Sequence, residues 1–303
     1  MFLHQIKKII YPYFISFLED ISQVRYEIGF PINSLEEILS GDELRIQWLR
    51  HSYKDRWFAD PFILDVTDDS IILLVEEFLY KAQKGRIARL TINRKTFRLE
   101  KNDLLLELNS HLSFPAIFRE DGQLFIYPEN CNDNHLILYQ FDDKKFQCLP
   151  VQTLIDAPLT DGIICDFLCG RLLLSTYLPD ANGKILTIYK RSSDNGLYVY
   201  NQEIQFDENI ARNAGACFSL NGRLFRPAQE CNQVYGHCVV LQEIKEDGKS
   251  LNFVEMCRLY STHKYMKDGL HTFNTFKGVH VIDVNGCRRP FIKGIINKLL
   301  FLL

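Results

Sequence analysis

The amino-acid sequence predicts an all-β fold, a five-bladed β-propeller with short helical or irregular N- and C-terminal segments. Three observations lead to this fold class. A pattern of two short apolar strands joined by a turn occurs five times, its copies are about fifty residues apart, and helical periodicity is almost absent outside residues 1–20 and the C-terminal tail. A repeat of this length, with strand and turn signals inside each unit, is typical of propeller blades.

The five copies can be aligned on equivalent positions. They are RWFADPFILDVTDDSIILLVEEF (56–78), SFPAIFREDGQLFIYPEN (113–130), TDGIICDFLCGRLLLSTY (160–177), NAGACFSLNGRLFRPAQE (213–230) and LHTFNTFKGVHVIDV (270–284). The matching first-strand positions are separated by 54, 47, 53 and 57 residues: Asp60, Phe114, Asp161, Ala214 and His271. The alternative is a sandwich of unrelated hairpins, and the regular spacing favours the propeller.

Further strand-like runs lie between the copies, namely GRIARLTI, HLILYQF, KILTIYKR and HCVVLQEI. Each run would supply the third strand of a blade, and the polar stretch after it the fourth. The sequence therefore predicts an N-terminal segment over 1–44 that leads into the propeller. The propeller itself is expected over 45–288 and an amphipathic C-terminal tail over 289–303.

Composition limits the class of protein. The net charge is −3 and the pI is about 6.3, which argues against a nucleic-acid partner held by a broad basic face. The nine cysteines form no C-x-x-C pair and no zinc-like spacing with histidine, so we expect free thiols in a reducing cytosol, no metal and no cofactor. No signal-peptide core or membrane-spanning apolar run is present in the sequence, and we expect a cytoplasmic protein.

Both ends of the chain are apolar and basic. Lys7 and Lys8 lie near the start, and the sequence closes with RRPFIKGIINKLLFLL. One interpretation is that the two terminal segments pack on the body of the protein. The other is a peripheral contact with the anionic inner surface of the membrane, for which residues 292–303 could form an amphipathic helix.

The propeller prediction brings polar residues together at one mouth of the central channel. The innermost strand of a blade lines the channel and its neighbour runs antiparallel, so the first strand starts where the second ends. Asp60 and Glu77 become neighbours by this reasoning. The same mouth receives Glu129, Asp161, Ser175, Arg226, Gln229, His271 and Asp283. Such groups are tolerated around a wet pocket rather than inside a core.

Carboxylates facing one another across a sugar ring are the working groups of glycoside hydrolysis. The candidate catalytic residues are Asp60, Asp161, Glu129 and Glu77. The alternative is that these are ordinary turn residues, because aspartate is common in the turns of any β protein.

Cationic and hydrogen-bonding residues accompany the carboxylates. The candidate substrate-binding residues are His111, Arg212, Arg226, Gln229, Tyr235 and His271. Arginine suits bidentate recognition of a carboxylate or phosphate, so we expect a glycan or sugar-phosphate ligand with an anionic group, such as a uronate. The alternative is that the arginines only neutralise the aspartates and lock the blades together.

An ordered set of motifs resembles a known family. YEIGF, ADPF, VEEF, HLSFP, YPEN, RNAG, RPAQEC and GLHT resemble the N-terminal propeller domain of plant glucosamine inositolphosphorylceramide transferases and its bacterial stand-alone relatives, which are often linked with surface-polysaccharide synthesis. The resemblance covers roughly residues 26–284. That domain is similar in fold to glycoside hydrolase family 43.

The resemblance implies roles for individual residues. Asp60 in ADPF matches the general base of family 43 and Asp161 its pKa-tuning aspartate. The family's general acid, a blade-four glutamate, is missing from ARNAGACF, so Glu129 or Glu77 would have to replace it. The resemblance implies a carbohydrate-active protein of cell-surface polysaccharide or glycolipid assembly. The alternative is a non-catalytic glycan-binding module or a partner of a glycosyltransferase, since the plant proteins carry glycosyl transfer on a separate C-terminal domain.

Overall fold

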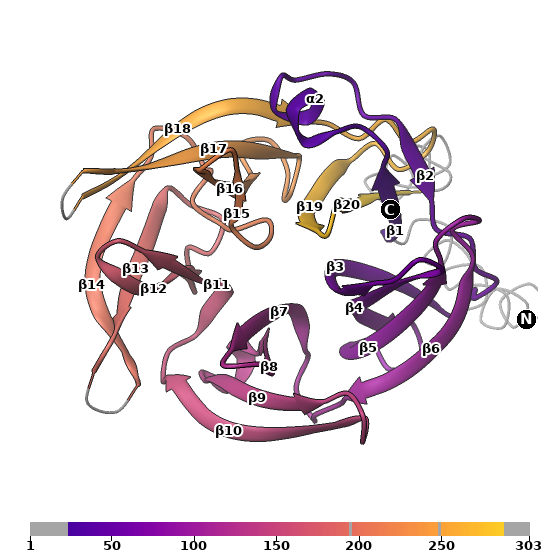
Figure 1. Cartoon of the computed structure of the whole chain (residues 1–303), viewed down its shortest axis with the longest axis horizontal. Helices are drawn as coiled ribbons and strands as arrows, with labels where there is room; N and C mark the ends of the chain where they lie inside the picture. Colours follow the sequence, from indigo (N-terminus) through magenta and orange to yellow (C-terminus); the bar gives the residue numbers. More distant parts are fainter. Residues whose placement is uncertain (1–23, 194–195, 248–249, 288–303) are drawn as a thin grey trace, which may run out of the picture.

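The computed structural model describes residues 24–193, 196–247 and 250–287, and it confirms the five-bladed β-propeller (Figure 1). Five four-stranded antiparallel sheets surround a central channel, with β3, β7, β11, β15 and β19 innermost. Residues 1–23 of the predicted N-terminal segment and the predicted tail 289–303 lie outside the described residues. No helix in the described ranges is long and apolar enough to cross a membrane.

Blades one to four follow the order of the chain from the channel outwards. Blade one holds β3 (Arg56–Val66), β4 (Ser70–Leu79), β5 (Lys84–Asn93) and β6 (Leu99–Leu106). Blade two holds β7 (Ser113–Glu120), β8 (Gln123–Glu129), β9 (Leu136–Asp142) and β10 (Gln147–Ile155), with the 3-10 turn η1 (Cys131–Asp133). Blade three holds β11 (Leu159–Phe167), β12 (Gly170–Tyr177), β13 (Ile185–Arg191) and β14 (Tyr198–Gln205). Blade four holds β15 (Phe218–Leu220), β16 (Arg223–Glu230), β17 (Cys238–Asp247) and β18 (Ser250–Leu259).

Blade five combines both ends of the described chain. Its inner strands are β19 (Gly269–Phe276) and β20 (Val279–Gly286), and its outer strands are β1 (Arg25–Pro31) and β2 (Ile46–Trp48), joined through the short helix α2 (Leu35–Leu39). β1 pairs with β20 from Arg25 opposite Gly286 to Gly29 opposite Ile282. The propeller thus begins within the predicted lead segment 1–44 rather than at residue 45. The physical reason is closure of the ring. Strands from the two ends of the described chain pair in one sheet, and the hydrogen bonds between them close the propeller.

Apolar side chains fill the space between neighbouring blades. The cluster between blades five and one joins Ile28 and Phe30 of β1 to Phe58, Leu73 and Leu90 of blade one. All five are nearly inaccessible to solvent. This packing fixes the two blades relative to each other and so fixes the edge of the channel between them.

A bulge marks the start of most inner strands. The pairing register shifts between Ala59 and Phe62, between Ser113 and Ala116, and between Thr160 and Ile163. The first residue inside each of these bulges has a positive φ angle, which is 50° at Asp60, 43° at Phe114 and 46° at Asp161. A further shift surrounds His271, between Leu270 and Thr272. Bulges of this kind re-aim side chains next to functional sites, and these four positions are among the five equivalent positions of the sequence repeat.

The closing role of β1 can be tested with Phe30→Ala. Phe30 is 1% exposed and packs against Phe97 with ring centroids 5.1 Å apart. We expect a loss of about 3–5 kcal/mol in the free energy of unfolding, because a buried aromatic is replaced by a cavity. Ile32→Ala is the matched control, since Ile32 follows β1 and is 54% exposed. Its expected change is within about 0.5 kcal/mol. Equal losses in chemical denaturation would contradict closure through β1.

Candidate functional site

A cavity of about 420 Å³ opens at the mouth of the channel where the inner strands begin. All five blades contribute to its wall, which consists of Val24, Tyr26, Trp57, Asp60, Glu76, Phe78, Gln83, His111, Ser113, Glu129, Asp161, Arg212, Tyr235 and His271. Seven of the ten candidate residues named from the sequence line it: Asp60, Asp161, Glu129, His111, Arg212, Tyr235 and His271.

Glu77 lies away from the cavity, and its neighbour Glu76 takes the position expected for it. Successive strand residues point to opposite faces, and the prediction located the end of β4 without choosing the face. Glu77 is 1% exposed within blade one, where it accepts hydrogen bonds from Arg56 at 2.7 Å and Arg86 at 2.7 Å. It is therefore part of a structural ion cluster.

Arg226 and Gln229 are also outside the cavity wall. Arg226 is completely buried in blade four, where it donates to Asn213 Oδ1 and Gln242 Oε1, each at 2.7 Å, and to the carbonyls of Ile210 and Ala211. It holds the strands of blade four together and is not available to a ligand. Gln229 lies behind the wall and supports it, as described below.

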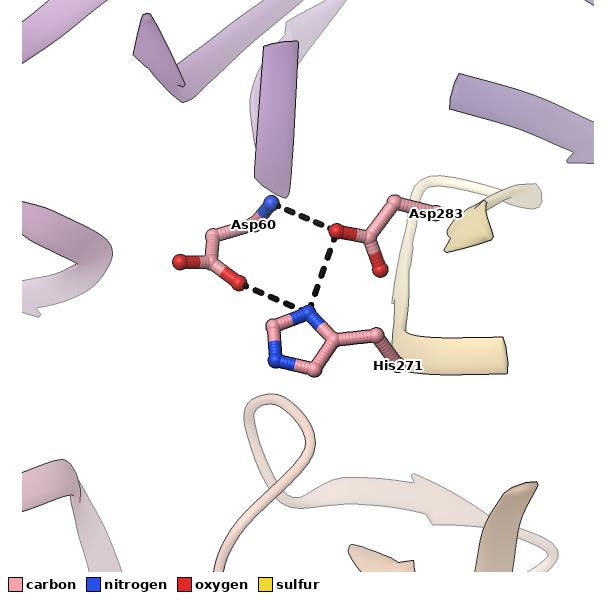
Figure 2. A group of neighbouring side chains, drawn as sticks. All are labelled: Asp60, His271 and Asp283. Carbon is pink, nitrogen blue, oxygen red and sulfur yellow. Dashed lines mark hydrogen bonds and ion pairs between the residues drawn. The ribbon is translucent and has the colours of Figure 1, made fainter. Parts of the chain in front are cut away.

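Asp60, His271 and Asp283 form a buried cluster between blades one and five (Figure 2). His271 Nδ1 lies 3.2 Å from Asp60 Oδ1 and 3.2 Å from Asp283 Oδ2. Burial opposes a charge on the imidazole, but Tyr235 and the two carboxylates raise the pKa of His271 well above its ordinary value. Burial raises the pKa of Asp60, while His271 overcomes burial at Asp283 and lowers the pKa of that carboxyl. The cluster is therefore an imidazolium between two acidic side chains.

This protonation state decides what Tyr235 offers to the cavity. Its hydroxyl lies 2.5 Å from His271 Nε2. A protonated imidazole donates from both nitrogens, so the Tyr235 oxygen accepts this hydrogen bond. Its own O–H is then directed elsewhere, and Tyr235 is a donor for an acceptor atom in the cavity.

The same cluster holds the atoms that could bind a metal ion, because its three ligand atoms lie within 4.8 Å of one another. The donor set does not fit a cation. Asp283 Oδ2 already accepts from the Asp60 amide at 2.9 Å, and its Oδ1 accepts from both the amide and the hydroxyl of Thr272. The positive charge is supplied by His271, whose Nδ1 proton a metal ion would have to displace.

A second cluster joins blades two, three and four. Arg212 Nε donates to Asp161 Oδ2 at 2.5 Å, and its Nη2 lies 3.5 Å from Glu129 Oε2. Gln229 Nε2 donates to the same Asp161 oxygen at 2.8 Å, and the Asp161 amide donates to Glu129 Oε2 at 2.8 Å. Arg212 thus neutralises Asp161, and Gln229 fixes the orientation of that carboxylate.

Glu129 is the second carboxyl group of this cluster. Burial, followed by the nearby charge of Asp161, raises its pKa to about 8. At neutral pH Glu129 is therefore mostly a neutral carboxylic acid that can donate a proton or a hydrogen bond. Glu129 therefore has the protonation state of a general acid.

Glu76 and His111 form the third polar group of the wall. Glu76 Oε1 lies 3.2 Å from His111 Nε2, and burial raises the pKa of Glu76 to about 7. His111 Nδ1 accepts from the Gly85 amide at 3.0 Å, which leaves Nε2 facing Glu76. A Cβ atom at Gly85 would lie 2.5 Å from Glu76 Oε1, so this pair depends on glycine at that position.

Three aromatic side chains complete the wall on the side of blades five and one. The rings of Trp57 and Phe78 are stacked, with centroids 4.6 Å apart and an interplanar angle of 2°, and Tyr26 lies 4.7 Å from Trp57. None of these three residues is among the candidate site residues named from the sequence. The alternation in YEIGF and VEEF was the signal that could have placed Tyr26 and Phe78 beside the channel.

Comparison with known protein families shows which family the chain belongs to. The model of the family described as glucosamine inositolphosphorylceramide transferase 1, N-terminal, matches residues 47–289. The chain belongs to this family. A curated relative of that name from Oryza sativa subsp. indica is 26% identical over 201 residues, which are 64% of this chain and 27% of the relative. The relative from Arabidopsis thaliana is 26% identical over 200 residues, with 62% and 26% covered. The chain therefore spans about a quarter of the length of these relatives.

Solved structures share the fold of this family member. A family 43 β-xylosidase/α-arabinofuranosidase from a compost metagenome, solved with xylotriose, matches with a TM-score of 0.53 and 11% identity over 77% of this chain and 87% of that chain. An exo-β-1,3-galactanase from Phanerochaete chrysosporium matches with a TM-score of 0.51 and 8% identity over 76% and 60%. At these identities the likeness concerns the fold alone, and it confirms the resemblance to the family 43 propeller.

The neutral state of Glu129 predicts a pH dependence. The folded chain holds this proton up to about pH 8, whereas an unfolded glutamate loses it near 4.5. Between these values the folded state binds more protons, so the Glu129 contribution to stability decreases as pH rises. Glu129→Gln imitates the neutral acid, and its stability relative to wild type should increase from pH 5 to pH 8 in urea denaturation.

Glu120→Gln is the control with the opposite sign. Arg171 and then Arg191 lower the pKa of Glu120, so its contribution is present above about 4.5 and is lost in acid. Between pH 5 and pH 8 its stability relative to wild type should stay constant. A Glu129→Gln difference that is equally flat would contradict a neutral Glu129.

Proposed function

We propose that this chain is a glycan-binding propeller that holds a sugar unit in the central cavity and serves a glycosyltransferase in cell-surface polysaccharide or glycolipid assembly. The observation that carries the proposal is the pairing of an aromatic wall with a polar wall whose carboxylates are already engaged. Trp57 and Phe78 offer apolar ring surface to a sugar, and the opposite side offers hydrogen-bonding groups. Cavities of about 420 Å³ are within the size range of small-ligand sites.

Hydrogen-bonding groups in the wall support a ligand rich in hydroxyl groups. Gln83, Ser113 and the Tyr235 hydroxyl line the cavity beside the carboxyl groups of Glu129 and Asp161. Asp60 Oδ1 lies 3.2 Å from His271 Nδ1 and Glu76 Oε1 lies 3.2 Å from His111 Nε2, and these pairs hold the two carboxyl groups in place.

The family supports the biological context. The curated relatives are named glucosamine inositolphosphorylceramide transferases, and this chain spans about a quarter of their length. We therefore assign binding of the glycan to the propeller that the chain shares with these relatives, and transfer of the sugar to a separate glycosyltransferase.

An uncharged sugar has more support than the expected uronate or phosphosugar. Of the two arginines assigned to an anionic group, Arg226 lies inside blade four. Arg212 is bonded to Asp161 and, through Nη1, to Asn182 Oδ1 at 2.9 Å. An anionic ligand would have to compete with Asp161 for this guanidinium.

Glycoside hydrolysis is the second candidate function, and the neutral Glu129 favours it. Glu129 would protonate the leaving group and Asp60 would activate water, as in acid–base hydrolysis. Asp60 is poorly prepared for this role because its Oδ2 accepts the Phe114 amide at 3.0 Å and its Oδ1 faces the charged His271. Glu230, the remaining blade-four glutamate near the mouth, is bonded to the Asn232 amide and does not line the cavity.

Trp57 provides a direct test of binding. The chain has two tryptophans, and Trp48 packs against His263 outside the cavity wall. In a Trp48→Phe protein we expect a saturable change in Trp57 fluorescence with a binding member of a panel of galactose, xylose, glucosamine, N-acetylglucosamine, glucuronic acid and their oligosaccharides. Trp57→Ala should weaken calorimetric affinity about three- to tenfold, the value of one aromatic contact. Absence of binding across the panel would contradict the proposal.

Two substitutions distinguish binding from hydrolysis. We expect no release of reducing ends from a bound oligosaccharide by the wild-type chain. Turnover that disappears in both Asp60→Asn and Glu129→Gln, with the Trp57 fluorescence response retained, would replace the binding proposal with the hydrolytic one. Loss of about 10²–10⁴-fold for each group is the size expected for acid–base catalysis.

A further inference from the structure

Large apolar side chains are exposed in the loops around the mouth of the channel. Val24, Tyr53, Val234, Tyr260 and Tyr265 are between 38% and 51% exposed, and we call these five residues the apolar rim. They lie before β1, between β2 and β3, between β16 and β17, and between β18 and β19. All these connections are at the end of the propeller where the cavity opens.

The opposite end of the propeller has a different surface. Among the described turns there, the large exposed apolar side chains are Ile32, Leu168 and Leu197, and none is aromatic. Tyrosine is enriched where a protein meets the interface between lipid and water, because its ring is apolar and its hydroxyl is polar. The exposed tyrosines therefore make the mouth face, rather than the opposite end, the candidate surface for contact with lipid.

The apolar rim is continuous with the candidate site. A second hollow of about 420 Å³ is lined by Val234, and it shares Val24, Tyr26 and Tyr235 with the cavity of the candidate site. Tyr260 packs against His237 of the same hollow, with ring centroids 5.9 Å apart. A surface that contacts this rim also covers the approach to the cavity.

Basic residues accompany the rim tyrosines. Lys54 follows Tyr53, and Lys264 and Lys267 lie on either side of Tyr265, all three exposed. The exposed Asp55 and Asp268 directly follow Lys54 and Lys267 and offset part of this positive charge. Lys264 Nζ lies 5.1 Å from the Tyr265 ring centroid. Lysine beside an interfacial aromatic adds attraction to anionic headgroups.

The described chain enters and leaves the propeller on this face. Val24 precedes β1, and Cys287 follows β20 where Gly286 pairs with Arg25. The sequence immediately beyond Cys287, residues 288–303, contains four basic residues, no acidic residue and a majority of apolar residues. These sequences therefore continue from the face that carries the apolar rim.

We propose that the mouth face docks on an anionic lipid surface through the apolar rim, so that the cavity opens toward the lipid headgroups. The occupant of this face is a phospholipid bilayer. Apolar area supplies one part of the attraction, and the lysines beside it supply an electrostatic part that salt weakens.

Vesicle binding of the full chain tests the proposal. We expect the wild-type chain to float with phosphatidylcholine vesicles that contain phosphatidylglycerol, and to bind weakly to phosphatidylcholine alone. The double substitution Tyr260→Ser and Tyr265→Ser should reduce partitioning about tenfold, because two partly apolar side chains leave the interface. Leu168→Ser is the matched control, since Leu168 is 93% exposed on the opposite end, and it should leave partitioning unchanged.

Hydrogen–deuterium exchange on the unsubstituted chain gives an independent measurement of the face. With anionic vesicles we expect slower exchange in loops 231–237 and 260–268 and no change in the turn at 167–170. Absence of vesicle binding would overturn the proposal. So would binding that protects only the turns opposite the cavity, or only residues 288–303. Sugar binding is measured without vesicles, so its failure and the failure of docking remain distinguishable.

Discussion

The hydrogen bonds that carboxylates accept from the backbone of a neighbouring blade are the constraint on which the rest of the structure depends. Asp283 of blade five accepts the amide of Asp60, Asp60 accepts the amide of Phe114 in blade two, and Glu129 of blade two accepts the amide of Asp161 in blade three. Each donor lies in a bulge with positive φ, a backbone conformation that persists when its surroundings hold it. The groups suited to acid–base chemistry are thus also the ties that hold the inner strands together.

Because the same carboxyl groups tie the strands together and lie in or next to the cavity wall, the partners of these groups determine the charges there. Charging a buried carboxylate is costly unless a partner offsets the loss of water. His271 supplies that partner for Asp283, and Arg212 supplies it for Asp161. Glu129 shares Arg212 with Asp161 and remains neutral instead. Asp283 and Asp161 are held in place by these partners, whereas the neutral Glu129 can still donate a proton or a hydrogen bond.

The features that repeat from blade to blade were predictable from the sequence, and those that occur only once were not. The spacing of Asp60, Phe114, Asp161 and His271 identified the blades, because each blade solves the same packing problem, and the structure adds a bulge at each of these positions. Closure through β1 was not predictable from the repeat, since its partner strand β20 lies more than two hundred residues away. Arg226 was misplaced because position near a strand end does not tell whether a side chain faces the channel or the interior of its own blade.

Docking of the mouth face on a lipid surface, as proposed above, would lower the affinity that the site requires. A sugar attached to a lipid is confined to the headgroup layer, and a protein docked on that layer meets it at a high effective concentration. Modest contacts are then sufficient, such as one aromatic wall, the Tyr235 hydroxyl and the other polar groups of the cavity wall. A propeller that holds a glycolipid headgroup in this orientation exposes it beside the bilayer, where a membrane-associated glycosyltransferase can reach it.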